Sequence, residues 1–268
     1  MIRSFNWTIF FVLLAAGVVG TLAIIPFLEA IPSVETNPSV ETNSVTTEVK
    51  PSLLNIVIVT LLNSTILLAV LIGIGLILAN RVGLRLPILE SWFGNGQPVN
   101  WKMLVLIAIA VGVGLGILLS LIDVLAFTPY TKELKTQFPS ISLWKQLLAG
   151  FSAGINEELQ MRLFLFSLIV WALSFLWKAN NGSPATGTYW VANVIVALIF
   201  GLGHLPITAS FTPLTLPIVL RAILLNGIAG VTFGYLYWQQ GLEAAILAHM
   251  STDFAIAILN QWGLAGSA

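Results

Sequence analysis

The chain of 268 residues is 57% hydrophobic and only 8% charged, whereas about 25% of residues are charged in typical soluble domains. Its eleven basic and eleven acidic residues give no net charge, which argues against a basic surface for nucleic acid. The absence of cysteine excludes disulfides, thiolate catalysis and cysteine-ligated zinc. We therefore expect an all-α, polytopic transmembrane helical bundle whose surroundings are the lipid bilayer, with no nucleic-acid partner.

The first half of the chain predicts three spans. Residues 5–28 form a longer apolar run than the 7 to about 15 residues of a signal-peptide core, so we expect a retained span. Residues 32–43 contain the hexapeptide PSVETN twice, which predicts a solvated polar loop. Further spans are expected over about 53–78 and 103–127. Within the last of these, Gly112 and Gly116 predict a helix-packing stripe of small residues.

The second half predicts four more spans. Residues 141–177 contain almost no loop signal, and a helix of that length, at about 1.5 Å per residue, exceeds a hydrocarbon core of about 30 Å. We expect a joint between Gly150 and Gly154, with an interfacial or re-entrant helix before it and a span after it. Spans over 189–204, 218–238 and 242–262 complete about seven spans plus that extra helix.

Basic residues predict the orientation of the N-terminal spans. Arg3, Arg81, Arg85 and Lys102 lie near the N-terminus or in the connector of residues 81–102. By the positive-inside rule, both regions are expected on the cytoplasmic side. After residue 129 the basic residues are too evenly spread to orient the last four spans. The host is expected to be a plasma membrane of bacterial type or an equivalent internal membrane.

Three groups of polar residues are unexpected inside apolar helices. An ionised side chain at a helix centre costs roughly 2.5 to 3.5 kcal/mol even on gentle insertion scales, so each needs a partner, water or a function. Glu158 and Arg162 are one turn apart and can neutralise each other. Glu157 points about 100° away and stays available for another contact. His249 and Asp253 are also one turn apart, where the carboxylate can orient the imidazole or hold it protonated.

The third group is His204, and its depth is predicted to match that of Glu157. Glu157 is expected to begin its helix and His204 to end the next one, so an antiparallel helix pair brings them to the same side. His249 lies about 10 Å into the last helix and reaches that depth only if this helix starts inside the membrane or tilts. Arg221 and Glu243 are expected near helix ends, where snorkelling solvates them.

The order of these motifs on successive helices resembles the CPBP family. This family includes the CAAX prenyl endopeptidases of the Rce type and the bacterial Abi or bacteriocin-processing membrane proteins. The motifs are Glu-Glu-x-x-x-Arg at 157–162, Phe-x-x-x-His at 200–204 and His-x-x-x-Asp at 249–253. The resemblance covers about 141–262. The three N-terminal spans with polar loops, over 1–140, do not carry these motifs, whereas 141–268 is expected to be a CPBP-like catalytic core; together they are expected to form one integral membrane domain.

The resemblance implies an intramembrane endopeptidase that hydrolyses a peptide bond of a membrane-associated protein or peptide. Glu157 would be the general base that activates water, and His204 would help to hold that water. His249 and Asp253 would stabilise the oxyanion. Glu158 and Arg162 would support the helix that presents Glu157.

Asp253 departs from the pattern of the prenyl-protease branch, which has Asn at this position. An ionised aspartate has no proton to donate to a developing oxyanion. Asp253 is therefore expected either to be protonated or to keep His249 cationic, and the second is favoured because the two residues are close in sequence. The departure leaves open whether the substrate is lipidated.

Three alternatives stay open at this point. In a metal-dependent version, Glu157, His204 and His249 would hold zinc, whereas the favoured mechanism uses no cofactor. A proton-coupled transporter would also use buried carboxylates and histidines, although the chain shows no matching pair of broken helices in inverted repeats. A non-catalytic membrane scaffold or immunity protein could bind a partner through the same residues.

Overall fold

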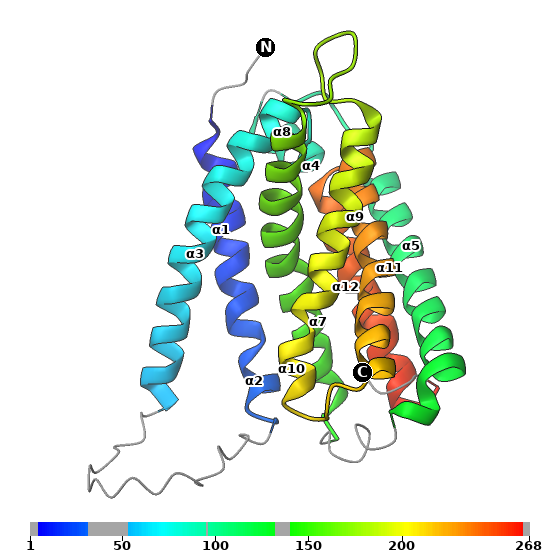
Figure 1. The fold of residues 1–268 in the computed structure, drawn as a ribbon. Helices are drawn as coiled ribbons and strands as arrows, with labels where there is room; N and C mark the ends of the chain where they lie inside the picture. Colours follow the sequence, from blue (N-terminus) through cyan, green and yellow to red (C-terminus); the bar gives the residue numbers. More distant parts are fainter. Residues whose placement is uncertain (1–4, 32–52, 95, 132–139, 265–268) are drawn as a thin grey trace, which may run out of the picture.

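The structure, a computed structural model, describes residues 5–31, 53–94, 96–131 and 140–264. Long helices lie side by side in one bundle (Figure 1), and these ranges contain no strand. The PSVETN repeat, Asn95 and residues 132–139 lie outside the described residues.

The N-terminal part contributes three long helices and several short ones. They are α1 (Trp7–Ala23), α2 (Ile25–Leu28), α3 (Leu53–Val82), α4 (Pro87–Phe93), α5 (Trp101–Ile122), the π-helical segment η1 (Asp123–Phe127) and the 3-10 turn η2 (Thr128–Tyr130). Asn6 and Asn100 cap α1 and α5 by accepting from backbone N–H groups of the first turn. Asn6 also donates to the Phe93 carbonyl at 2.9 Å, so the start of α1 and the end of α4 lie at the same end of the bundle.

The C-terminal part follows the predicted hydrophobic runs closely. Its elements are α7 (Leu143–Glu158), the π-helical segment η3 (Leu159–Phe166), α8 (Ser167–Leu173), α9 (Thr186–Gly203), α10 (Leu205–Ala209), α11 (Leu216–Gln240) and α12 (Leu242–Gln261). Pro206 and Pro217 stand in the first turns of α10 and α11, where a missing N–H costs no helical hydrogen bond.

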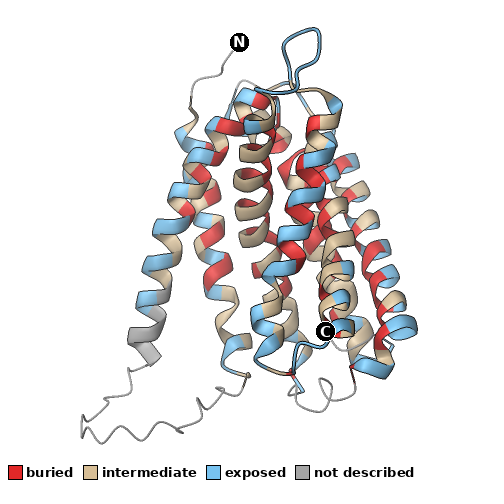
Figure 2. Ribbon diagram, viewed as in Figure 1, coloured by how far each residue is buried: buried red, intermediate tan, exposed pale blue. Residues whose placement is uncertain are grey.

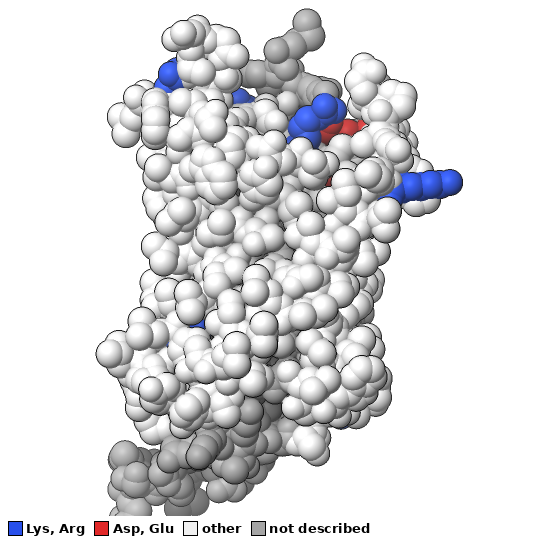
Figure 3. All heavy atoms as spheres, turned by 90° about the vertical axis from the view of Figure 1, so that its right-hand side faces the viewer, with Lys and Arg blue, Asp and Glu red and all other residues white. Residues whose placement is uncertain are grey.

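Six helices among the described residues are long and apolar enough to cross a membrane. They cover Trp7–Leu28, Leu61–Val82, Trp101–Tyr130, Thr186–Ala209, Leu216–Gln240 and Leu242–Gln261. Buried positions face the interior of the bundle and exposed ones face outward (Figure 2). Many outward side chains are large and apolar, such as Ile66, Leu106 and Leu125. Figure 3 shows one face as a broad uncharged band, with most of its visible charged atoms towards the upper end. The composition and arrangement fit a bundle surrounded by lipid.

The prediction of a joint between Gly150 and Gly154 is wrong. The helix is continuous from Leu143 to Leu173 through α7, η3 and α8 (Figure 1), and Glu157 lies near its middle instead of at its start. The two glycines serve packing: a Cβ on Gly150 would meet Asp253 Cβ at 2.7 Å, and one on Gly154 would overlap Met250. They therefore allow α12 to approach α7 closely.

This long helix accounts for the difference between the six apolar spans and the seven predicted. It lies among the other long helices of the bundle (Figure 1), but it is less apolar because it carries Glu157, Glu158 and Arg162. At about 1.5 Å per residue it is long enough to cross a hydrocarbon core of about 30 Å. The interfacial or re-entrant helix expected before Gly154 is its first half, not a separate element.

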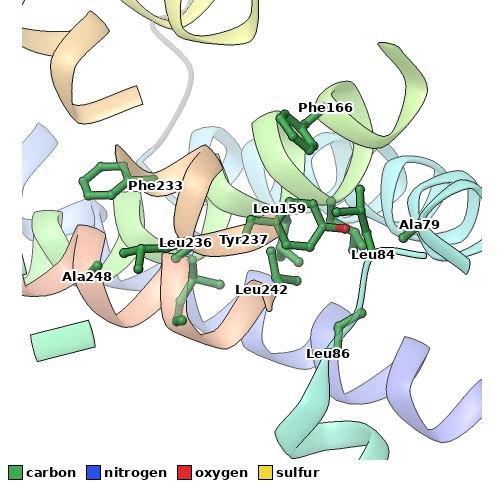
Figure 4. Close-up of a cluster of buried hydrophobic side chains, with 14 of the residues drawn as sticks. Ala79, Leu84, Leu86, Leu159, Phe166, Phe233, Leu236, Tyr237, Leu242 and Ala248 are labelled. Carbon is green, nitrogen blue, oxygen red and sulfur yellow. The ribbon is translucent and has the colours of Figure 1, made fainter. Parts of the chain in front are cut away.

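The apolar core joins both parts of the chain. Figure 4 shows part of it, in which Leu84 lies near Leu159 of η3 and near Tyr237 and Leu242. The labelled residues of α11 and α12 are Phe233, Leu236, Tyr237, Leu242 and Ala248. The Tyr237 hydroxyl lies 3.1 Å from Ser167 Oγ, so this buried phenol has a hydrogen-bond partner.

The predicted small-residue stripe on α5 packs against α12. A Cβ on Gly112 would overlap the Ala248 carbonyl, and one on Gly116 would lie 2.7 Å from the Thr252 carbonyl. Thr252 Oγ1 donates to the Gly112 carbonyl at 3.0 Å, which is possible only because the two backbones are close. Gly114, between the two, faces open space.

We expect Gly116→Leu to lower the unfolding temperature of the purified protein in detergent. The added side chain would separate α5 from α12, and overpacking of this kind costs about 1 to 3 kcal/mol. Gly114→Leu is the matched control and should unfold at the wild-type temperature, because a Cβ at this position would meet no neighbouring atom within 4 Å. Equal losses in both variants would contradict this account of the α5–α12 contact.

Candidate active site

Glu158 and Arg162 form a buried ion pair at the boundary of α7 and η3. Glu158 Oε1 lies 3.0 Å from Arg162 Nη1, and both side chains are 0% exposed. Arg162 Nη2 donates to the Gly230 carbonyl of α11 at 3.0 Å. Its guanidinium also lies over the rings of Phe200 and Phe233, 5.0 and 5.5 Å from their centroids. The arginine charge is thus surrounded by a carboxylate, a carbonyl and two aromatic faces.

His249 of α12 is held by the same carboxylate. Its Nδ1 lies 2.8 Å from Glu158 Oε1, and because an ionised carboxylate only accepts, Nδ1–H is the donor. Phe233 stacks on the imidazole with a centroid distance of 4.6 Å. These contacts direct Nε2 towards two further carboxylates, 3.6 Å from Asp253 Oδ2 and 3.9 Å from Glu157 Oε2.

His204 follows the last residue of α9 and lines the same cavity as Glu157 and His249. Its Nδ1 lies 2.8 Å from the Phe200 carbonyl of its own helix. Since a carbonyl only accepts, Nδ1 carries the hydrogen, and Nε2 of the neutral ring is left as an acceptor. The hydrogen bond of His204 to its own helix therefore leaves Nε2 available in the cavity.

A cavity of about 430 Å³ brings these groups together. It lies between helices from both parts of the chain, and its volume is within the range of small-molecule sites, about 300 to 1,000 Å³. Glu157 is 36% exposed and lines the cavity, whereas its neighbour Glu158 is fully buried behind it. The polar residues that line the cavity are Ser120, Asp123, Gln146, Glu157, His204, Thr208, Arg221, Asn226, His249, Thr252, Asp253 and Asn260.

Comparison with known proteins agrees with this geometry. Residues 139–255 match the family model described as type II CAAX prenyl endopeptidase Rce1-like. This segment is thus similar to the Rce1-like family. The resemblance to the CPBP family noted in the sequence is thereby confirmed. No curated protein and no solved structure matches the chain.

The Rce1-like segment contains all six residues singled out from the sequence motifs, from Glu157 to Asp253. The family match indicates an intramembrane endopeptidase that acts on a membrane-associated protein. Together with the apolar helices, it identifies a multi-pass integral membrane protein.

Two contacts of the Rce1-like segment were missed from the sequence. Glu158 was expected only to support its own helix, yet it also binds His249, which is 91 positions away in the chain. Arg221 was expected to snorkel, yet it donates two hydrogen bonds to the buried Asp123, at 2.6 and 2.8 Å. Asn226 of α11, which no sequence motif singles out, also lines the cavity. Nothing in the helical spacing of single segments indicates these contacts between helices.

In the zinc alternative, Glu157, His204 and His249 would be the ligands. Among the described residues, no three His, Asp or Glu side chains are grouped as a metal site. His249 Nδ1 is occupied by Glu158, so only Nε2 could bind an ion together with Glu157 and His204.

We expect Glu158→Gln to destabilise the protein much more than Glu157→Gln. Removing one charge of a buried pair leaves the other without compensation, which costs about 3 to 5 kcal/mol. Glu157 faces the cavity, so the same change there should leave the unfolding temperature in detergent almost unaltered. The double variant Glu158→Gln/Arg162→Met should recover part of the loss, because the unpaired cation is removed as well. Equal unfolding temperatures for the two single variants would contradict the assignment of Glu158 as the buried anchor.

Proposed function

We propose that this intramembrane endopeptidase is glutamate-dependent, with Glu157 and His204 activating a water molecule and His249 with Asp253 stabilising the oxyanion. The proposal is supported by the different surroundings of two adjacent carboxylates. Glu158 is enclosed and bound by Arg162 and His249, whereas Glu157 is exposed to the cavity. Glu157 can therefore meet water and substrate in the cavity while it lies near the imidazole of His249.

In the proposed first step, Glu157 takes a proton from water while the water oxygen attacks the peptide carbonyl carbon. The electron pair of the carbonyl bond moves to oxygen and forms the tetrahedral oxyanion. Glu157 then returns the proton to the amide nitrogen as the carbon–nitrogen bond breaks. General-base catalysis by a positioned carboxylate typically contributes about 10²- to 10⁴-fold.

The proposed role of His204 follows from its tautomer. The Nδ1–H group donates to the Phe200 carbonyl, so Nε2 can accept the second hydrogen of the attacking water. Two acceptors, Glu157 and His204, would then orient one water molecule with an oxygen lone pair towards the substrate. This arrangement requires no charge on His204.

The proposed oxyanion site is His249, positioned by Glu158. The Nδ1–H donation to Glu158 fixes the ring, and in the cationic form Nε2–H can donate to the developing oxyanion. Asp253 lies 3.6 Å from Nε2 and is proposed to favour that cationic form instead of donating a hydrogen bond itself. This role accommodates an aspartate where the prenyl-protease branch has an asparagine.

We expect Glu157→Gln to reduce peptide hydrolysis at least about 100-fold while the protein stays folded, because glutamine cannot accept the proton. The assay uses the purified full-length chain in lipid nanodiscs with a library of N-palmitoylated peptides, and cleavage products are identified by mass spectrometry. Glu29→Gln is the matched control, since Glu29 is an exposed carboxylate that does not line the cavity. Undiminished hydrolysis by the Glu157 variant would end the proposal.

The metal-free mechanism has its own test. After dialysis against a strong chelator, the wild-type protein is expected to keep its hydrolytic rate on the same peptide library. Loss of activity that zinc restores would instead assign Glu157, His204 and His249 as ligands of a catalytic ion.

A further inference from the structure

Three apolar residues in and beside α2 form one stripe along the cavity. The stripe consists of Ile24, which precedes α2, Phe27 within it and Ile31 shortly after it, at spacings of three and four residues. Leu28, the next residue after Phe27, is 51% exposed and does not line the cavity. The stripe is therefore a directed contact of this segment and not a general consequence of its apolar composition.

The stripe lies outside the segment that matches the Rce1-like family. The match covers residues 139–255, which include Glu157, His204, His249 and Asp253. The reactive groups thus come from the family segment, whereas one apolar wall beside them comes from the N-terminal helices. A wall supplied by a different part of the chain can differ between proteins without altering the reactive groups.

The stripe is held in place next to the proposed catalytic base. Asn156, the residue before Glu157, contacts α1: in the amide orientation that satisfies both of its polar atoms, it donates to the Gly17 carbonyl and accepts from the Thr21 N–H. These contacts are 3.0 and 3.2 Å long. A Cβ on Gly20 would lie 3.0 Å from the Asn156 amide, so α1 approaches α7 closely at this point. The position of α1 is thereby coupled to that of Glu157.

The other walls of the cavity indicate what it can accept. Ile207 and Phe211 line it near His204, and Ile256 lines it one turn below Asp253. Along α12 the lining extends from His249 to Asn260, which at about 1.5 Å per residue is about 16 Å. An extended peptide rises about 3.3 Å per residue, so this length takes a segment of about five residues.

We infer that Ile24, Phe27 and Ile31 form a specificity wall that contacts an apolar side chain of the substrate peptide near the cleaved bond. The inference rests on the proposed function, because the occupant is taken to be the peptide whose carbonyl Glu157-activated water attacks. Its support is the continuity of the apolar stripe with the cavity that contains the reactive groups. Phe27, as the largest side chain of the stripe, sets the size of the side chain that fits.

Cleavage preference gives the first test. In nanodiscs, N-palmitoylated peptides that differ at one position, from Ala to Leu to Trp, are compared for wild type, Phe27→Ala and Phe27→Trp. Removing the phenyl ring should raise kcat/KM for the Trp peptide relative to the Ala peptide by about tenfold, and Phe27→Trp should shift the ratio the other way. Leu28→Ala is the control and should leave the ratio unchanged. A uniform effect of the Phe27 variants on all peptides would overturn the inference.

Capture of bound peptide gives a second test that needs no turnover. Because the chain has no cysteine, Phe27→Cys and Leu28→Cys each carry a single benzophenone label, in a Glu157→Gln background that prevents hydrolysis. Photolysis should link the peptide to position 27 and only lipid to position 28. Equal capture at both positions, or lipid alone at position 27, would overturn the inference.

The two proposals fail in distinguishable ways. Full cleavage by Glu157→Gln ends the catalytic proposal. In that case the capture of peptide at positions 27 and 28 is compared in the wild-type background, and it still tests the specificity wall. Conversely, a lost contrast between these positions removes the specificity wall and leaves the dependence of hydrolysis on Glu157 intact.

Discussion

The site depends on one fully buried carboxylate that joins two helices. Glu158 Oε1 lies 3.0 Å from Arg162 on its own helix and 2.8 Å from His249 on α12. Arg162 continues the network to the Gly230 carbonyl and to the aromatic faces of Phe200 and Phe233. Ionised groups in hydrocarbon are costly unless they are paired, so moving α12 away would remove one of the two partners of the buried Glu158. The network therefore fixes the relative positions of α7, η3, α9, α11 and α12.

Two adjacent glutamates can take different roles because successive residues of a helix point about 100° apart. One side chain turns into the network and the other into the cavity. The backbone changes from α to π geometry directly after Glu158, and a second π-helical segment begins at Asp123, which pairs with Arg221 across the same cavity. Such segments are frequent at functional sites, because they reorient side chains without ending the helix. In both places here the change occurs at a buried carboxylate that binds an arginine.

The sequence allowed the helices and most of the candidate site to be predicted, but not the contacts between helices. Hydrophobic runs predict the spans to within a few residues because the bilayer sets their length, and the spacing of Glu158 and Arg162 correctly predicts their ion pair. Helical spacing says nothing about partners 91 or 98 positions apart, such as Glu158 with His249 or Asp123 with Arg221. The Gly150–Gly154 region was misinterpreted because glycine marks joints and close packing alike, and only the neighbouring α12 distinguishes the two.

Close packing by small residues explains how buried charges and a cavity coexist in a bundle of this size. Gly112 and Gly116 bring α5 against one side of α12, and Gly150 and Gly154 bring α7 against another. Near the polar network the helices are therefore in backbone contact and exclude lipid. Larger apolar side chains, such as Phe27 of α2, Ile207 of α10 and Ile256 of α12, line the cavity. Close packing fixes the polar residues of the candidate site, while apolar side chains shape the rest of the cavity wall. A substitution of a wall side chain can thus alter which side chain fits without moving the carboxylate and imidazoles, because Phe27, Ile207 and Ile256 make no contact within the polar network.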